Sequence, residues 1–491
     1  MAENEDRRIT HQEETKLADN NEQSDSHIQL NDSYTEFIKE IKVEIQEETK
    51  TSKAEEGGHN RIGWLPQILR RDNQKFVYTY CHPRELPIGP LCYDPSIDLP
   101  QKERDHLKDL IKNTRDLKIN LARKFVEKYF PENGQVENVL KKIKEKRGFK
   151  LQFCEIDVGE DALVRILFLD GCTILQFIES YMERRGGLEE FGIDRDRETL
   201  MVEDLFLLQN QIPFQVIVLF FELMKDEDHC ANLKMDIVFF LHMNNFMTHE
   251  PMLIYYFYDE DELLQIRNCG VHVHLLFLLH SFIAGHKYNR VDQISDPKSK
   301  RGGYNFRMRS VQELKSAGLE FKPTSTGSIS FSSKCFKING HLNLPPLIVN
   351  ERTEYKLKNL VAYEMSLPPH FLDQQTQYPV ISYVKFIDVL IDKEEDVKVL
   401  RASRVIQNHL SSDADVATLI NKLGSECFNP PHDLYKKVRK QIETHCQKKR
   451  AIWMAQVCEK HFSSPWTIVA LLAAALILLL TATQTWYAIR S

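Results

Sequence analysis

Apolar residues recur with helical spacing over most of this chain. Such stretches cover residues 102–130, 160–185 and 353–367, and each is followed by a proline or a glycine pair, which commonly end helices. Further helices are predicted at residues 135–147, 271–284, 380–391, 396–410, 413–423 and 432–462. The pattern predicts a mainly α protein, built around one large helical domain that covers residues 60–462.

One of the apolar stretches, residues 205–224, is long enough to raise the question of a membrane span. It contains Gln209, Asn210 and Gln211, and Pro213 would break a continuous helix. Polar side chains of this kind are costly in a bilayer, so a buried helix that begins near Pro213 is the better interpretation.

The hydrophobic period changes after residue 318. Ser310 and Glu313 form a capping box for a short helix that ends at Gly318, and alternating residues then predict strands at 327–338 and 341–349. Asn339-Gly340 between them is typical of a two-residue hairpin turn. The helical domain is therefore expected to carry a small β-hairpin insertion.

The last long apolar stretch, residues 465–487, contains no Asp, Glu, Lys or Arg. Its ends carry Trp466 on one side and Trp486 with Tyr487 on the other, as expected of residues at a membrane interface. This pattern predicts one C-terminal transmembrane helix, followed by a short tail at 488–491. Its position at the C-terminal end predicts a tail-anchored, single-pass protein, and the plasma membrane is the expected location. The basic residues before the segment favour a cytosolic location for the large N-terminal part.

Charge separates the N-terminal segment from the rest of the chain. The 491 residues carry a formal net charge of −7, but residues 1–56 alone hold sixteen acidic and seven basic residues, a net −9 that leaves about +2 elsewhere. Residues 1–59 are predicted to be an acidic disordered tail with a short amphipathic helix at 34–45. The nearly neutral remainder lacks the basic face of a nucleic-acid-binding protein.

Cations gather on the predicted helix before the C-terminal segment. Because juxtamembrane Lys and Arg attract acidic headgroups, this cluster is a hypothetical anionic-lipid contact. The alternative is an ordinary solvated helix face. The residues are Lys436, Lys437, Arg439, Lys440, Lys448, Lys449 and Arg450.

Candidates for catalysis are few. Cys172 follows Asp170-Gly171 within an apolar stretch, where a packed thiol is expected rather than a nucleophile. Asp170 itself needs a partner among apolar neighbours, and we expect a buried polar network with Gln209 or Asn210. His272, His274 and the pair His242 and His249 lack the convergent ligands of a zinc site. The sequence predicts no catalytic residue, cofactor or metal site.

Several short motifs occur in a fixed order from about residue 60 to the end. As an ordered set they resemble the plant family called domain of unknown function 247, or UPF0481. They are Pro87-Ile88-Gly89-Pro90, Leu169-Asp170-Gly171-Cys172, Gln209-Asn210-Gln211-Ile212-Pro213-Phe214, Glu313-Leu314-Lys315, Leu344-Pro345-Pro346-Leu347, Asn359-Leu360 and Pro465-Trp466.

The resemblance implies a plant-specific, mostly helical protein with a C-terminal transmembrane helix and no established biochemical activity. Members commonly have a His pair after Ile-Gly-Pro, where this chain has Leu91-Cys92-Tyr93, and Glu where it has Gln209. Roles that rest on that His pair or that Glu cannot be carried over.

These observations favour a membrane-tethered recognition or signalling protein that performs no catalysis. The expected partners are the lipid bilayer and other proteins or peptides. A homo-oligomer is a further expected state, because the small side chains from Leu472 to Ala475 would let two C-terminal helices approach closely. The alternative is a membrane-bound hydrolase or transferase on an unfamiliar helical fold.

Overall fold

The computed structural model divides the chain into two compact units, Met1–Phe240 with Glu260–Leu276, and Leu241–Asp259 with Phe277–Ser491. The predicted mainly helical character is confirmed. The residues that the structure describes are 62, 80, 82–94, 100–132, 134–146, 149–153, 156–183, 187–245, 273–284, 309–324, 328–333, 340–367, 378–427, 430, 434–447 and 465–490.

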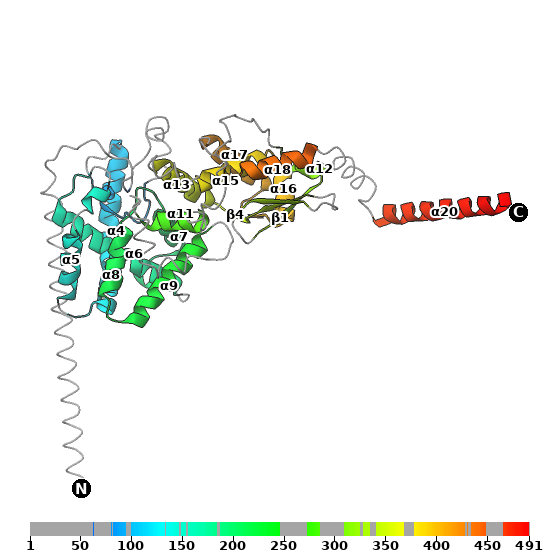
Figure 1. Ribbon diagram of the computed structural model, residues 1–491. Coiled ribbons are helices and arrows are strands. Elements are labelled where there is room, and N and C mark those ends of the chain that lie inside the picture. Colours follow the sequence, from blue (N-terminus) through cyan, green and yellow to red (C-terminus); the bar gives the residue numbers. More distant parts are fainter. Residues whose placement is uncertain are drawn as a thin grey trace, which may run out of the picture. The chain divides into compact units, whose positions relative to one another are not determined.

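The first unit is a group of helices around one buried helix, α6 (Figure 1). Helices α4, α5 and α8 pack against α6, whose sequence is apolar on nearly every side. The elements are η1 (Pro90–Tyr93), α4 (Gln101–Tyr129), α5 (Gln135–Glu145), η2 (Lys150–Gln152), α6 (Glu160–Met182), η3 (Glu189–Phe191), α7 (Arg195–Asp204), α8 (Phe214–Leu223) and α9 (Glu227–Asn244), whose last four residues belong to the second unit. A helix that is hydrophobic all round belongs in a core, and α6 occupies that position.

Gly171 in the middle of α6 allows α8 to approach closely. A Cβ atom at this position would lie 2.6 Å from Cε2 of Phe220, and the Phe220 ring is fully buried. Helix α8 begins directly after Pro213, so the interpretation of residues 205–224 as a buried helix starting there agrees with the structure.

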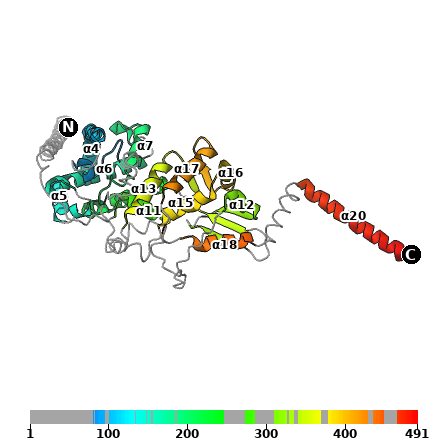
Figure 2. The ribbon, with the colours of Figure 1, turned by 90° about the horizontal axis from the view of Figure 1, so that it is seen from above.

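The second unit combines helices with two small sheets (Figure 2). Helix α17 contacts both α15 and α16, α13 contacts α15 and α17, and α12 contacts α16. The elements are α11 (Leu275–Ala284), which begins in the first unit, α12 (Val311–Ser316), β1 (Leu319–Pro323), β2 (Ser330–Ser333), β3 (Gly340–Leu344), β4 (Leu347–Val349), α13 (Thr353–Ser366), α15 (Pro379–Leu390), α16 (Glu394–Ala402), β5 (Ile406–Asn408), α17 (Asp413–Glu426), α18 (Lys436–Gln447) and α20 (Pro465–Arg490).

The β structure is larger than the predicted hairpin. Strands β2 and β3 are antiparallel, but Gly340 already pairs with Ser333 inside β3, so the predicted two-residue turn at Asn339-Gly340 is wrong. Strand β1 adds to β3 in parallel, and β4 pairs in parallel with β5. The predicted helix 396–410 was too long, because α16 ends at Ala402 and Arg404 adopts φ 58°, which no continuing α-helix permits.

The predicted transmembrane helix is also wrong. Helix α20 forms, but none of the helices in the described residues is both long and apolar enough to cross a bilayer. The uninterrupted apolar run, residues 468–480, covers only about 20 Å at ~1.5 Å per residue, whereas a hydrocarbon core measures ~30 Å. The single-pass, tail-anchored topology and the interface roles of Trp466, Trp486 and Tyr487 depended on that span.

Several other predictions lie outside the described residues. These are the acidic tail 1–59 with its helix at 34–45, the His residues 249 and 272, and the cations Lys448, Lys449 and Arg450.

Candidate functional site

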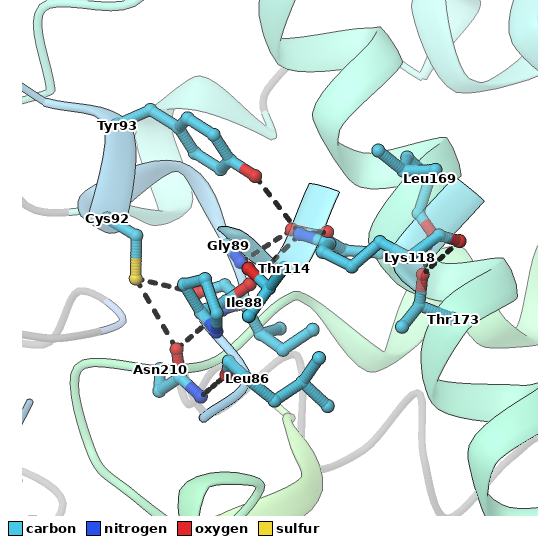
Figure 3. Close-up of polar contacts among 12 residues, drawn as sticks. Leu86, Ile88, Gly89, Cys92, Tyr93, Thr114, Lys118, Leu169, Thr173 and Asn210 are labelled. Atoms are coloured by element: carbon cyan, nitrogen blue, oxygen red, sulfur yellow. Dashed lines mark hydrogen bonds and ion pairs between the residues drawn. The ribbon is translucent and has the colours of Figure 1, made fainter. Parts of the chain in front are cut away.

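The centre of the first unit contains a buried ion pair. Lys118 of α4 and Asp170 of α6 have side chains that are 2% and 0% exposed, and they contact each other directly. Lys118 Nζ also donates to the carbonyl of Pro87 at 2.9 Å and to the Tyr93 hydroxyl at 3.0 Å. Figure 3 shows Tyr93 and Lys118 pointing toward one another. Burial disfavours the ammonium, but the carboxylate of Asp170 holds the pKa of Lys118 above its ordinary value.

The pair is part of a larger arrangement that holds residues 84–89 in place. Asp204 accepts the backbone N–H groups of Arg84, Glu85 and Leu86. Asn210 accepts Ile88 N–H at 2.6 Å, and Asp170 accepts Gly89 N–H at 2.7 Å. Position 87 is proline and has no N–H, so every backbone donor of this segment binds a carboxylate or an amide side chain. We call Lys118, Asp170, Asp204 and Asn210 the polar clamp.

The polar clamp takes the place of secondary structure. Residues 84–89 lie in neither a helix nor a strand, and buried backbone donors without partners would be destabilising. The amide of Asn210 also donates to the carbonyls of Leu86 and Asp204, at 2.9 and 2.8 Å. One side chain therefore joins two chain segments that are more than 100 residues apart.

Gly89 is required at the end of this segment. Its φ is +78°, and a Cβ atom there would lie only 2.3 Å from the carbonyl oxygen of Gln211. Gln211 is itself fixed, because its amide donates to the carbonyls of Leu205 and Leu207 and accepts Leu276 N–H. The close approach leaves room only for a residue without a side chain.

The chemistry of this region fits a structural role better than a catalytic one. Burial raises the pKa of the Cys92 thiol to about 12, so it is not a thiolate at neutral pH. A neighbouring cavity has a volume of only about 20 Å³, which is room for about one water molecule and far too small for a substrate. Its lining is apolar apart from Asn210 and Gln211.

Two of the residues that the sequence singles out lie in the polar clamp. Asp170 and Asn210 both belong to the polar clamp and bind adjacent backbone groups, whereas Gln209 is only partly buried. Cys92 and Tyr93, at the positions of the usual His pair, contact Asn210 and Lys118. Cys172 is a fully buried free thiol.

Sequence reasoning missed Lys118 and Asp204. Lys118 continues the buried stripe of α4, which also includes Leu107, Leu110, Thr114 and Phe125. A cation at a core-facing position of an amphipathic helix is a signal that could have revealed it, because buried charges need partners.

A second buried pair lies in the second unit. His280 Nε2 lies 2.7 Å from Glu364 Oε1, and both side chains are fully buried. The Glu364 carboxylate also accepts the N–H groups of Val380 and Ile381, at 2.8 and 2.9 Å, and so caps the start of α15. This arrangement, like the polar clamp, uses an ionisable side chain to satisfy backbone donors.

The helix α18 carries the predicted basic cluster. Lys436, Lys437 and Lys440 are exposed, while the Arg439 guanidinium lies 5.0 Å from the centre of the Phe386 ring. The opposite side of the helix is buried through Ile442, His445 and Cys446. Within the described part of the chain, Lys437 and Lys440 make no ion pair. We call the three exposed lysines the lysine face.

Carboxyl groups also gather where α4, α6 and α9 meet. Glu179 accepts hydrogen bonds from the Tyr129 hydroxyl and from Lys128. Burial, reinforced by the charge of Glu179, raises the pKa of Asp236 to about 6, although Lys128 opposes the shift. The described residues bring no three potential ligands together as a metal site.

The raised pKa of Asp236 predicts a pH-dependent change in stability. The folded state binds the proton more tightly than the unfolded state, so this carboxyl lowers stability progressively as the pH rises from its ordinary pKa of 3.8 to about 6, and the full cost is present above that. Asp236→Asn should therefore raise the free energy of unfolding at pH 7.5, by about 1 kcal/mol after allowance for solvent screening. The gain should vanish near pH 4. Denaturation at both pH values measures it.

The exposed Asp109 of α4 provides the control. Asp109→Asn should change stability little, and equally at both pH values. A gain for Asp236→Asn that persists unchanged at pH 4 would show that its charge is not the cause.

Comparison with known proteins identifies relatives of this chain. A family model described as DUF247, plant protein of unknown function, matches residues 62–480. A putative UPF0481 protein of Arabidopsis thaliana is 32% identical over 178 residues, which is 36% of this chain and 32% of the relative. Another UPF0481 protein of that plant is 26% identical over 185 residues, 37% of each. The matched stretches thus span about a third of each relative.

No solved structure matches the chain. The family model covers most of the sequence, including the polar clamp and the lysine face, and the two relatives carry the name of the same uncharacterised group. The chain therefore belongs to the DUF247 family of plant proteins of unknown function.

Proposed function

We propose that this protein is a recognition protein without catalytic activity, and that it binds acidic segments of partner proteins through the lysine face. The observation that carries the proposal is that Lys437 and Lys440 are exposed and have no acidic partner among the described residues. Both lie on a helix whose other side is anchored in the second unit. Such a surface is available to an external anion.

The lysines at the C-terminal end of α5 differ from Lys437 and Lys440 in having acidic neighbours. Lys141, Lys144 and Lys146 are also exposed, but they lie 3.8, 2.5 and 3.9 Å from the carboxylates of Glu145, Asp161 and Glu222. Their charge is therefore largely compensated locally. Lys437 and Lys440 of α18 have no such partner among the described residues, so they form a more attractive surface for an acidic partner, because opposite charges steer association and favour complementary surfaces.

The absence of catalysis is supported by the use of the buried ionisable groups. The carboxylates of Asp170, Asp204 and Glu364 bind backbone N–H groups of their own chain. A catalytic acid or base must reach a substrate, whereas these three carboxylates are fully buried and already accept hydrogen bonds from the backbone.

The experiment compares two triple variants of the full chain. Lys436→Gln/Lys437→Gln/Lys440→Gln should weaken the binding of a fluorescent poly-glutamate 20-mer about tenfold at low ionic strength, since each exposed contact contributes up to ~1 kcal/mol. The control triple at the end of α5, Lys141→Gln/Lys144→Gln/Lys146→Gln, should bind as the natural protein does. Fluorescence anisotropy gives the dissociation constants.

Binding to lipid vesicles distinguishes an acidic protein segment from an anionic lipid as the partner. The lysine face would instead contact anionic lipid if its triple variant lost affinity for phosphatidylserine vesicles while the poly-glutamate affinity stayed the same. Equal poly-glutamate binding by both triple variants would contradict the proposal.

A further inference from the structure

The second unit has a sheet edge whose outward backbone groups have no hydrogen-bond partner in the part of the chain that the structure describes. The three-stranded sheet has the order β1-β3-β2, so β2 lies at an edge. Within β3, Gly340 donates its N–H to Gly318 next to β1, and the Leu344 carbonyl accepts from Thr324. Backbone groups alternate in direction along a strand. Residues 341 and 343 therefore face β2.

The register then fixes the direction of every backbone group in β2. Ser332 pairs with His341, and Ser330 pairs with Asn343, so these serines direct their N–H and C=O groups toward β3. Phe331 and Ser333 direct theirs away from the sheet. Among the described residues, nothing hydrogen-bonds to these outward groups.

The two edges of the sheet differ in how they are protected. Strand β1 contains Glu320, Lys322 and Pro323, and charges and proline are the usual means of preventing an edge from pairing with another chain. Strand β2 reads Ser-Phe-Ser-Ser and has neither. It is short and polar, and suits a specific added strand better than general aggregation.

Helix α18 lies against this strand. The ring of His445 is 5.6 Å from that of Phe331, and a Cβ atom added at Gly340 would lie 3.3 Å from His445 Nε2. Lys440 is about 8 Å from His445 along the helix axis, at ~1.5 Å per residue. Because α18 contacts β2, it brings the positive charge of the lysine face into the neighbourhood of this strand, and charges attract over about a Debye length, ~8 Å at physiological salt.

We propose that β2 accepts an acidic, extended peptide segment of a partner protein as an additional strand. The outward groups of Phe331 and Ser333 would supply main-chain hydrogen bonds, and the lysine face would select acidic side chains, a recognition mode known as β-augmentation. The inference rests on the proposed function and adds to it the conformation and the binding edge of the partner.

The first test removes one outward donor. Ser333→Pro deletes an N–H that faces away from β3 and leaves the bonds between β2 and β3 intact, since proline is tolerated at such positions. Its matched control, Ser333→Ala, keeps the N–H. The probes are fluorescent, end-capped octapeptides in which Glu alternates with Thr or Val. Ser333→Pro should bind them about tenfold more weakly than the natural chain, and Ser333→Ala should bind them normally.

The second test does not depend on how a variant folds. The same octapeptides are N-methylated either at odd or at even residues and bound to the natural chain. A strand pairs through one edge only, so one methylated set should lose affinity and the other should keep it. Equal affinities for the two sets would overturn the inference, as would failure of the natural chain to bind the unmethylated peptides.

The outcomes separate this inference from the proposed function. The lysine-face variant could lose poly-glutamate binding while Ser333→Pro still binds the octapeptides normally and N-methylation has no effect. That combination of results would leave the lysine face as a binding surface and reject the added strand. If light scattering showed a dimer of the natural chain that Ser333→Pro converts to a monomer, the added strand would be a second copy of β2. That result would reject the peptide as occupant.

Discussion

Asp170→Ala is expected to lower the free energy of unfolding of the first unit by about 3–5 kcal/mol, because it leaves the ammonium of Lys118 buried without a counter-charge. The Lys118 side chain is only 2% exposed, so water cannot replace the lost carboxylate. The substitution also removes the acceptor of Gly89 N–H. Chemical denaturation followed by circular dichroism measures the loss, and hydrogen exchange should show faster exchange at residues 84–89.

Two further variants test the explanation. Lys118→Met/Asp170→Leu removes both charges and should recover more than half of the loss, because well-packed apolar side chains often replace a buried pair without penalty. Glu190→Ala breaks the exposed pair between Lys124 and Glu190 and should cost less than ~1 kcal/mol. An Asp170→Ala loss no larger than that of Glu190→Ala would mean that the ion pair does not stabilise the fold.

Gly89→Ala should have the next largest effect, a loss of about 3 kcal/mol or more. The positive φ of +78° is unfavourable for alanine, at ~1–2 kcal/mol, and the new Cβ would lie 2.3 Å from the Gln211 carbonyl oxygen. Overpacking of this kind adds ~1–3 kcal/mol. Gln211 cannot move away cheaply, because its side chain binds the backbone at three points. Thermal denaturation is the measurement.

Gly134 separates the two causes. Its φ is +83°, nearly the same as that of Gly89, but a Cβ atom there would have nothing within 4 Å. Gly134→Ala should therefore cost only the conformational term, about 1 kcal/mol. Equal losses at the two positions would show that the close approach to Gln211 is unimportant.

Local pattern predicted the helices of this protein well. The periodic stretches at 102–130 and 160–185 correspond to α4 and α6 within a few residues, because amphipathic or fully apolar helices carry their signal in the sequence itself. Strand β4 lies within the predicted strand 341–349, whereas β5, of three residues, is too short to display a period and falls inside the predicted helix 396–410. The apolar run of α20 was extended too far across its threonines.

The sequence shows that a buried polar side chain such as Asp170 needs a partner, but not which residue that partner is. A carboxylate within the apolar stretch around Asp170 signals a buried partner, yet nothing local indicates that this partner is Lys118. The same holds for the acceptors of residues 84–89, since the chain folds back over 81 to 122 residues to bring them together. Partner identity depends on the tertiary fold, which local periodicity does not encode.

The polar clamp also has a consequence for biosynthesis. Leu86 and Asn210 are separated by 124 residues, so the backbone of residues 84–89 leaves the ribosome long before its last acceptor has been translated. At ~5–20 residues per second, this interval lasts about 6–25 seconds. During that time Leu86 and Ile88, which are fully buried in the finished protein, have no place to pack. Nascent chains halted before residue 204 should therefore be open to proteases and chaperones at this segment, and chains that extend well beyond residue 210 should be protected.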